Sequence, residues 1–541
     1  MSMSFRGARP KLVLLALDSA DCALARRWAN AGYLPTLARL FEKGISLPIA
    51  TPPGVLEGAV WPTLLTSQSV GNHGLFAYRQ VIPGSYDLEI AMTADRITQP
   101  PFWFFLGQAG ARVTVIDAPF ARPLRNLRGL QVTNWGAHDP WCWPTSSWPR
   151  RLVGDLCARF GEHPVGMCDQ KERTLAEYRD LRERLLRGAR TKARLLRYCL
   201  DLEDWDFFFG VFSESHCVGH QFWHFFDASH PRYDPGAGAD LNAAIRDVYR
   251  EIDRGLGLLI QALPDAAHVL ILFSHGMGPY YHGSHLLDHI LQRLGMDEPT
   301  PQRAGGARAQ YEISSGRSLV WSLSRLAPRA VRDRIKARLP HELVGRFWRW
   351  THPEPHPWSR ARAFQVPSSN MTGAIRINVK GREPAGKVEP GAEYDELCRE
   401  LAEALMELQN PATGRKAVQW VARARDLYDG PMLHRLPDLF VEWDHSAPIT
   451  ALSSARIGTV EGVFPGSRTG SHWPHALLLA AGPEFASGEI AAKMRTVDIA
   501  PTVLDFFGAP APRSYEGVSV LPLLASRPKA NHPAEVFHPP S

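Results

Sequence analysis

Short, continuous runs of apolar residues are the most regular pattern along the chain. They occupy residues 12–17, 113–116, 207–212, 269–273 and 477–479. Runs of this length without polar alternation predict β-strands that are buried on both faces. Segments with helical periodicity lie between them, at residues 24–43, 174–202 and 241–263. This alternation predicts an α/β fold, in which a mostly parallel sheet is sandwiched between helices.

The region after residue 285 has a different character. Residues 286–370 are rich in Arg, Trp and Pro and have weak strand signals, which predicts an inserted lid. The next segment, 371–430, combines a strand-like AIRINV with a helical stretch and predicts a small α+β subdomain. The sequences PDLFVEW and HALLLAAGPEF then predict a return to the core. We therefore expect core segments at 1–285 and 431–541, separated by an insertion and subdomain at 286–430.

Polar residues follow three of the predicted strands directly. Asp18 ends the first, Ser213 to His216 follow the third, and Ser274 and His275 follow the fourth. In open α/β sheets, ligands bind outside the carboxyl ends of the strands. These residues therefore predict one shared site.

Composition narrows the class of protein. The 541 residues are 45% hydrophobic and 21% charged, which is typical of a globular chain and not of a disordered one. The net charge of +6 is spread among acidic residues, so no nucleic-acid-binding stripe is expected, although an anionic substrate is compatible with it. No segment approaches the ~18 apolar residues of a membrane span. Seven cysteines without a CxxC pair argue against a disulfide framework and favour a cytoplasmic location.

The most specific local pattern is His216-Cys-Val-Gly-His220. On a helix, residues four apart share a face, as in the HExxH helices that bind zinc. The alternative is a pair of hydrogen-bonded histidines in an aromatic region, because QFWHFF follows at once. Their place just beyond a buried strand favours metal ligands. His224 continues the spacing inside the aromatic run, which favours a supporting or packing role.

Three further residues are weak indicators when taken alone. Asp18 is also explained as a helix-capping carboxylate. His275 lies in FSHGMG, where the two glycines permit a tight turn beside a bound group. His472 lies in RTGSH, shortly before a strand.

Together, these segments resemble the alkaline phosphatase superfamily, and particularly its nucleotide pyrophosphatase/phosphodiesterase branch. LVLLALDSAD is similar to the segment with the first metal-binding Asp, and VWPTLLTSQSVGNHGLF to WTSFLTG…P…HG. ESHCVGHQFW resembles E-x-D-x-x-G-H, and HVLILFSHGMG resembles SDHG(M). RTGSHWPHALLLAAGPEF and the closing VDIAPTVLDFFGAPAPRSYEGVSVLPLL resemble the last two family segments. The resemblance thus covers the whole predicted core.

The resemblance implies one or two divalent metal ions, with zinc the expected metal, and a small anionic ester as substrate. One ion would be held by His216, His220 and His472. The other would be held by Asp18 and His275.

The sequence departs from the family pattern at three places. His216 replaces an Asp, which is benign because three neutral imidazoles bind zinc and leave a fourth position open. Ser274 replaces the Asp of the DHG motif. This loss of a carboxylate weakens binding of the second ion and leaves Ser274 a supporting role. Counting back from Thr66, the usual Ser or Thr nucleophile falls on Glu57.

Glu57 would supply the missing carboxylate, and water would then be the attacking group. In the alternative register, Glu57 is only a carboxylate near a helix N-terminus, and Thr51 or Thr63 is the hydroxyl.

The sequence predicts a metal-dependent hydrolase of phosphate ester bonds, of the phosphodiesterase or pyrophosphatase type. A sulfatase or phosphonate hydrolase of the same superfamily is one alternative. Sulfatases that use formylglycine are set aside because Cys22 to Arg26 lacks the Pro of Cys-x-Pro-x-Arg. A catalytically silent binding or scaffold protein is the other alternative, motivated by the missing nucleophile and the missing Asp.

Overall fold

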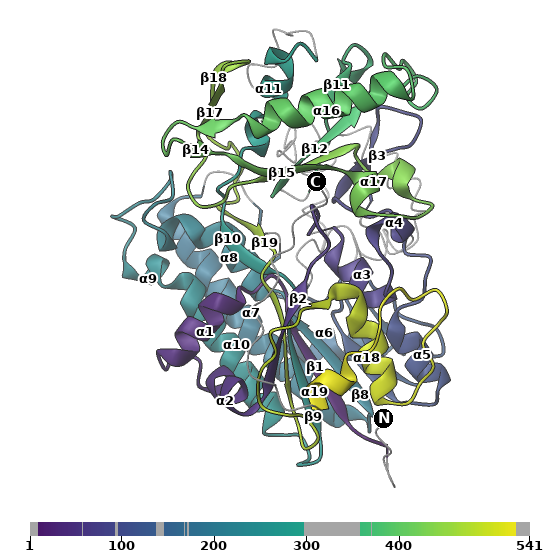
Figure 1. The fold of residues 1–541 in the computed structure, drawn as a ribbon. Coiled ribbons are helices and arrows are strands. Elements are labelled where there is room, and N and C mark those ends of the chain that lie inside the picture. Colours follow the sequence, from purple (N-terminus) through teal and green to yellow (C-terminus); the bar gives the residue numbers. More distant parts are fainter. Residues whose placement is uncertain are drawn as a thin grey trace.

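The computed structural model describes residues 9–56, 58–91, 96–136, 145–166, 168–169, 173–296, 357–368 and 371–525. Within these ranges, a large sheet with helices on both sides lies below a smaller group of sheets that carries one long helix (Figure 1).

The large sheet is mostly parallel at its centre. β1 (Leu12–Leu17) lies between β8 (Phe207–Phe212) and β9 (His268–Phe273), parallel to both. The sheet continues beyond β8 with the parallel strands β5 (Val113–Ile116) and β6 (Gly129–Thr133) and the antiparallel β7 (Ser146–Trp148). Beyond β9 come β20 (Ala476–Ala481) and β2 (Ile45–Ala50), both antiparallel to their predecessor, and then β21 (Gly488–Glu489); β22 (Met494–Arg495) also pairs with β2. The predicted α/β fold class is confirmed.

Both faces of this sheet are covered, which explains the apolar runs. In β1, Val13, Leu15 and Leu17 pack into one core cluster and Leu12, Leu14 and Ala16 into another. The first face carries α1 (Cys22–Asn30), α2 (Pro35–Lys43), α7 (Leu175–Leu202), α8 (Glu214–Phe226) and α10 (Ala244–Ile260). The second carries α3 (Val60–Thr66), α5 (Phe102–Gln108), α18 (Ile499–Phe506) and α19 (Leu521–Ala525).

Helix boundaries follow from local chemistry. The helix predicted over 24–43 is two helices, because the chain turns at Gly32 with φ +80° before Pro35 starts α2. At the start of α7, the Thr174 hydroxyl accepts the Glu177 N–H while the Glu177 carboxylate accepts the Thr174 N–H.

A second, antiparallel sheet has its own core. Its order is β11 (Ala363–Gln365), β12 (Thr372–Ile377), β16 (Leu439–Trp443) and β15 (Val418–Arg423), and α16 (Ala392–Met406) packs on it. The strand in PDLFVEW was expected in the large sheet, and this was wrong, because β16 pairs with β12 and β15. An apolar run marks a strand as buried but carries no information on which sheet covers it. The boundaries at 285 and 430 stay predictions, and residues 297–356 of the expected insertion lie outside the described residues.

A short ribbon leads from the large sheet to the second one. β10 (Gly276–Pro279) pairs antiparallel with β19 (Gly470–Trp473), so that Met277 lies opposite His472 and Gly278 opposite Ser471. The Trp473 indole lies across Gly278, where a Cβ atom would come within 2.1 Å of the ring. The ribbon therefore needs glycine at this position.

Two further findings concern membrane-spanning helices and the cysteines. None of the helices described here is long and apolar enough to cross a membrane. Among the described residues, the thiols of Cys22, Cys199 and Cys398 form no disulfide.

Candidate metal centre

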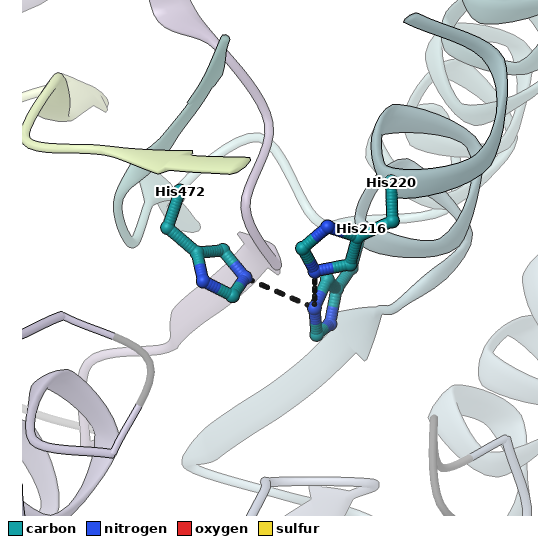
Figure 2. A group of neighbouring side chains, drawn as sticks. All are labelled: His216, His220 and His472. Carbon is teal, nitrogen blue, oxygen red and sulfur yellow. Dashed lines mark hydrogen bonds between the residues drawn. The ribbon is translucent and has the colours of Figure 1, made fainter. Parts of the chain in front are cut away.

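Three buried histidines from two elements meet at the carboxyl end of the large sheet. His216 and His220 lie one turn apart on α8, and His472 lies on β19 (Figure 2). The Nε2 atom of His216 is 2.8 Å from Nε2 of His220 and 3.1 Å from Nε2 of His472. One ligand atom from each ring lies within 4.8 Å of the others.

Hydrogen bonds of the Nδ1 atoms of His216 and His220 determine which ring nitrogens face the centre. His220 Nδ1 lies 2.8 Å from the carbonyl oxygen of Gly470 and donates to it. His216 Nδ1 lies 3.1 Å from Oδ2 of Asp18 and donates to that carboxylate. With both Nδ1 atoms donating away from the centre, the two Nε2 atoms face each other at 2.8 Å, an arrangement that a cation between them stabilises. Three imidazole nitrogens with carbonyl and carboxylate partners behind them form a donor set that fits zinc.

Asp18 lies directly behind this group. Its Oδ1 accepts a hydrogen bond of 2.8 Å from the Trp61 indole N–H and a longer one of 3.5 Å from the Ser274 hydroxyl. Burial raises the pKa of Asp18, but the charge and hydrogen bond of His216, the charge of His275 and the Trp61 N–H together lower it to about 2. Asp18 is thus a carboxylate that orients His216.

His275 adjoins the group without pointing a nitrogen at the same centre. Its ring centroid is 4.8 Å from that of His472. Its Nε2 lies 2.6 Å from the Ser19 hydroxyl, and its Nδ1 lies 3.1 Å from the Ser274 hydroxyl. Among the described residues, Asp18 and His275 do not form a second group of three metal-ligating side chains.

Two other predicted residues lie elsewhere or cannot be placed. His224 is one turn beyond His220, but its Nδ1 contacts the Thr469 hydroxyl at 3.0 Å. Burial and then the charge of Arg232 lower its pKa to about 3, so it is a neutral packing residue. Glu57 lies outside the described residues.

The alternative hydroxyl of Thr63 lies inside α3 and contacts His73 Nε2 at 3.0 Å. Burial lowers the pKa of His73 to about 3, so the ring is neutral. Its Nδ1 accepts the Leu75 N–H, so the ring proton is on Nε2 and points at Thr63. His73 therefore donates to Thr63 and is not placed to accept its proton.

Sequence reasoning missed a second buried polar group beside α8. Asp117 directly follows β5 and pairs with Lys192, whose ammonium lies 5.3 Å from the Trp135 ring centroid. His163 Nε2 lies 2.8 Å from Oε1 of Glu214, the first residue of α8. Burial raises the pKa of Glu214, but His163 and the charge of Lys192 lower it below its usual value. Asp117 directly follows a buried strand, as Asp18 does, so the same sequence signal could have identified it.

Comparison with known proteins places the chain in a family. The family model described as type I phosphodiesterase / nucleotide pyrophosphatase matches residues 12–462. Human arylsulfatase K is 39% identical over 67 residues, a match that spans 12% of this chain and 12% of that protein.

Two solved structures are similar to this one in backbone structure. Phosphonoacetate hydrolase from Sinorhizobium meliloti, in complex with phosphonoformate, has a TM-score of 0.49 and 13% identity over 94% of this chain and 98% of that one. Murine ectonucleotide pyrophosphatase/phosphodiesterase 5 has a TM-score of 0.46 and 12% identity over 95% and 99%. The match of the family model over most of the chain shows that it belongs to the type I phosphodiesterase/nucleotide pyrophosphatase family, which confirms the resemblance found in the sequence.

Proposed function

We propose that this member of the type I phosphodiesterase/nucleotide pyrophosphatase family is a metal-dependent hydrolase of phosphate ester bonds, in which water is the attacking group. The observation that carries the proposal is the convergence of three imidazole nitrogens, with the Nε2 atoms of His216 and His220 only 2.8 Å apart. Family membership supports the substrate class, a small anionic phosphodiester or pyrophosphate.

Each side chain has a distinct task in this proposal. His216, His220 and His472 hold one divalent ion, with zinc the expected metal, and Asp18 keeps the His216 lone pair directed at it. When bound, such an ion polarises the ester and lowers the pKa of a water molecule. Asp18 and His275 are the residues proposed for a second ion. Ser274 supports them, because it contacts Asp18 at 3.5 Å and His275 at 3.1 Å.

Glu57 is proposed to supply a carboxylate where related enzymes have a hydroxyl nucleophile. A carboxylate held against cations is a poor nucleophile, because its charge is already engaged. The tautomer of His73 supports the same conclusion, since it leaves Thr63 without a base on that side.

Stereochemistry at phosphorus tests the mechanism. Attack by water is one in-line displacement and gives inversion, whereas a covalent phospho-enzyme requires two displacements and gives retention. The measurement is hydrolysis of a chiral, isotopically labelled phosphodiester. Retention, or transfer of the phosphoryl group to an added alcohol, would contradict attack by water.

A sulfatase is the second candidate, because the short match to human arylsulfatase K favours it. Tetrahedral sulfate and phosphate esters present similar charge to such a site. An assay panel of chromogenic phosphomonoesters, phosphodiesters, phosphonates and sulfates ranks the candidates by kcat/KM. Stoichiometric metal with no turnover on any ester would instead favour a binding or scaffold protein. A cytoplasmic location, favoured by seven cysteines without a CxxC pair, belongs to the same proposal.

A further inference from the structure

The segment that leads into β19 is hydrogen-bonded to α8 at consecutive positions. Thr469, directly before β19, donates its backbone N–H to the His220 carbonyl oxygen at 2.6 Å. The Thr469 hydroxyl donates to the same oxygen at 3.2 Å. The next residue, Gly470, accepts the hydrogen bond of 2.8 Å from His220 Nδ1. His220 is therefore held at its main chain by Thr469 and at its ring by Gly470.

The Thr469 side chain also reaches the next turn of α8. Its hydroxyl oxygen accepts from the backbone N–H of His224 at 3.4 Å and lies 3.0 Å from Nδ1 of that ring. In a regular α-helix, the His220 carbonyl and the His224 N–H bond to each other. One hydroxyl thus contacts both groups of this pair. Thr469 is fully buried, which excludes water from these contacts.

Two glycines allow the close approach of the two elements. A Cβ atom on Gly470 would lie 2.2 Å from the Gly219 carbonyl oxygen, so any larger residue would push β19 away from α8. On Gly219, a Cβ atom would lie 2.4 Å from the Met277 side chain of β10, the strand paired with β19. Because His472 follows Gly470 by two residues, this contact also sets how far His472 lies from the histidines of α8.

The three-histidine group needs such a contact because its members come from two elements (Figure 2). Helix geometry alone brings His216 and His220 together. His472 lies 256 positions from His216 along the chain, so only tertiary contacts bring its ring to the other two. A metal site needs its ligands within about 0.5 Å of the productive geometry. The contacts of Thr469 and Gly470 are those that join β19 to a ligand residue of α8.

We propose that Thr469 is a positioning residue for the first ion. By binding the main chain of His220, it holds β19 against α8, so that His472 completes the set of three nitrogen ligands. This inference rests on the first-ion site of the proposed function. It is independent of the substrate, of the second ion and of Glu57.

Cobalt(II) titration of full-length, chelator-treated protein tests this role. Cobalt(II) is accepted by zinc-type sites, and its visible absorption reports the geometry of its ligands. Thr469→Val removes the hydroxyl and retains the branched shape. We expect cobalt binding about tenfold weaker, the lower end of the range for a partner behind a ligand, together with an altered visible spectrum. Thr469→Ser keeps the hydroxyl and should restore both the affinity and the spectrum.

His224→Ala is the matched control for the lost hydroxyl. It removes the contact of the hydroxyl with the His224 ring and leaves the donation to His220 in place. Its cobalt affinity and spectrum should equal those of the unchanged protein. Thermal unfolding of each variant measures stability separately. A lower unfolding temperature of Thr469→Val with an unchanged spectrum and affinity would show a merely structural role and overturn the proposal.

The same titration distinguishes failure of this inference from failure of the proposed function. Absence of cobalt binding by the unchanged protein, or equal binding by His216→Ala, would contradict the three-histidine site itself, and this inference with it. Where the site binds cobalt and His216→Ala does not, the positioning role alone is at stake. It is then overturned if Thr469→Val matches the unchanged protein, if Thr469→Ser restores neither property, or if His224→Ala reproduces the loss.

Discussion

The two halves of the predicted metal centre differ in what holds their histidines. In the first half, His216 and His220 each use Nδ1 to donate to a carboxylate or carbonyl oxygen, which turns both Nε2 lone pairs toward one point. In the second half, both ring nitrogens of His275 face hydroxyl groups, those of Ser19 and Ser274. Whether a histidine can bind a metal ion thus depends on the hydrogen-bond partner of its other ring nitrogen as well as on its place in the sequence.

Charge separates the two halves as well. The buried carboxylate of Asp18 lies between the two halves, and its Oδ2 already accepts a hydrogen bond from His216. Where the family pattern has a second carboxylate, Ser274 offers a neutral hydroxyl. The first half therefore has ligands and a counter-charge, whereas the second depends on Asp18 and on Glu57. Substitutions in each half, and one in the residue that donates to Asp18, test this contrast.

Removal of a ligand from the first half should have the largest effect. His220→Ala or His472→Ala should lower zinc affinity by more than about 100-fold, because loss of a partner behind a ligand alone costs roughly 10–100-fold. His224→Ala is the matched control, since this histidine lies on the same helix but contacts Thr469. Zinc titration after chelation measures the effect. Full zinc occupancy in both ligand variants would contradict the proposed first site.

A change in the second half should have a smaller effect in the opposite direction. Ser274→Asp should raise the zinc stoichiometry from one towards two, because an added carboxylate next to Asp18 is stabilised by a second cation. Ser274→Asn, with a similar shape and no charge, should not. Elemental analysis of both variants after zinc loading measures the ratio. Equal stoichiometry in both would mean that residue 274 does not face a second ion.

The contrast also shows what the sequence could and could not predict. The strands at 12–17, 113–116 and 207–212 agree with the structure to the residue, because strands buried on both faces are continuous apolar runs. The spacing of His216 and His220 predicted their shared face, which follows from helix geometry alone.

Other features depend on contacts between distant segments. The indole of Trp61 reaches Asp18 from 43 positions away, and Glu214 meets His163 from 51 positions away. No local periodicity encodes such pairs. The placement of β16 in the second sheet fails for the same reason, since its apolar pattern would suit either sheet.

The smallest expected effect is the change in zinc affinity on substitution of Trp61. It tests whether Asp18 acts on the first ion through His216. Trp61→Phe removes the 2.8 Å hydrogen bond to Asp18 Oδ1 and retains an aromatic ring in the same core cluster. If Asp18 orients His216, zinc affinity at the first site should fall about tenfold, the lower end of the range for a partner behind a ligand.

Trp103→Phe provides the matched control for this change. Trp103 lies in the same core cluster as Trp61, is equally buried, and its indole N–H has no hydrogen-bond partner among the described residues. The two substitutions therefore remove the same volume, and they differ in the hydrogen bond to Asp18. Zinc titration of both variants isolates the contribution of that bond. Equal affinities would mean that Asp18 does not act through His216, and would leave it as a candidate ligand of the second ion alone.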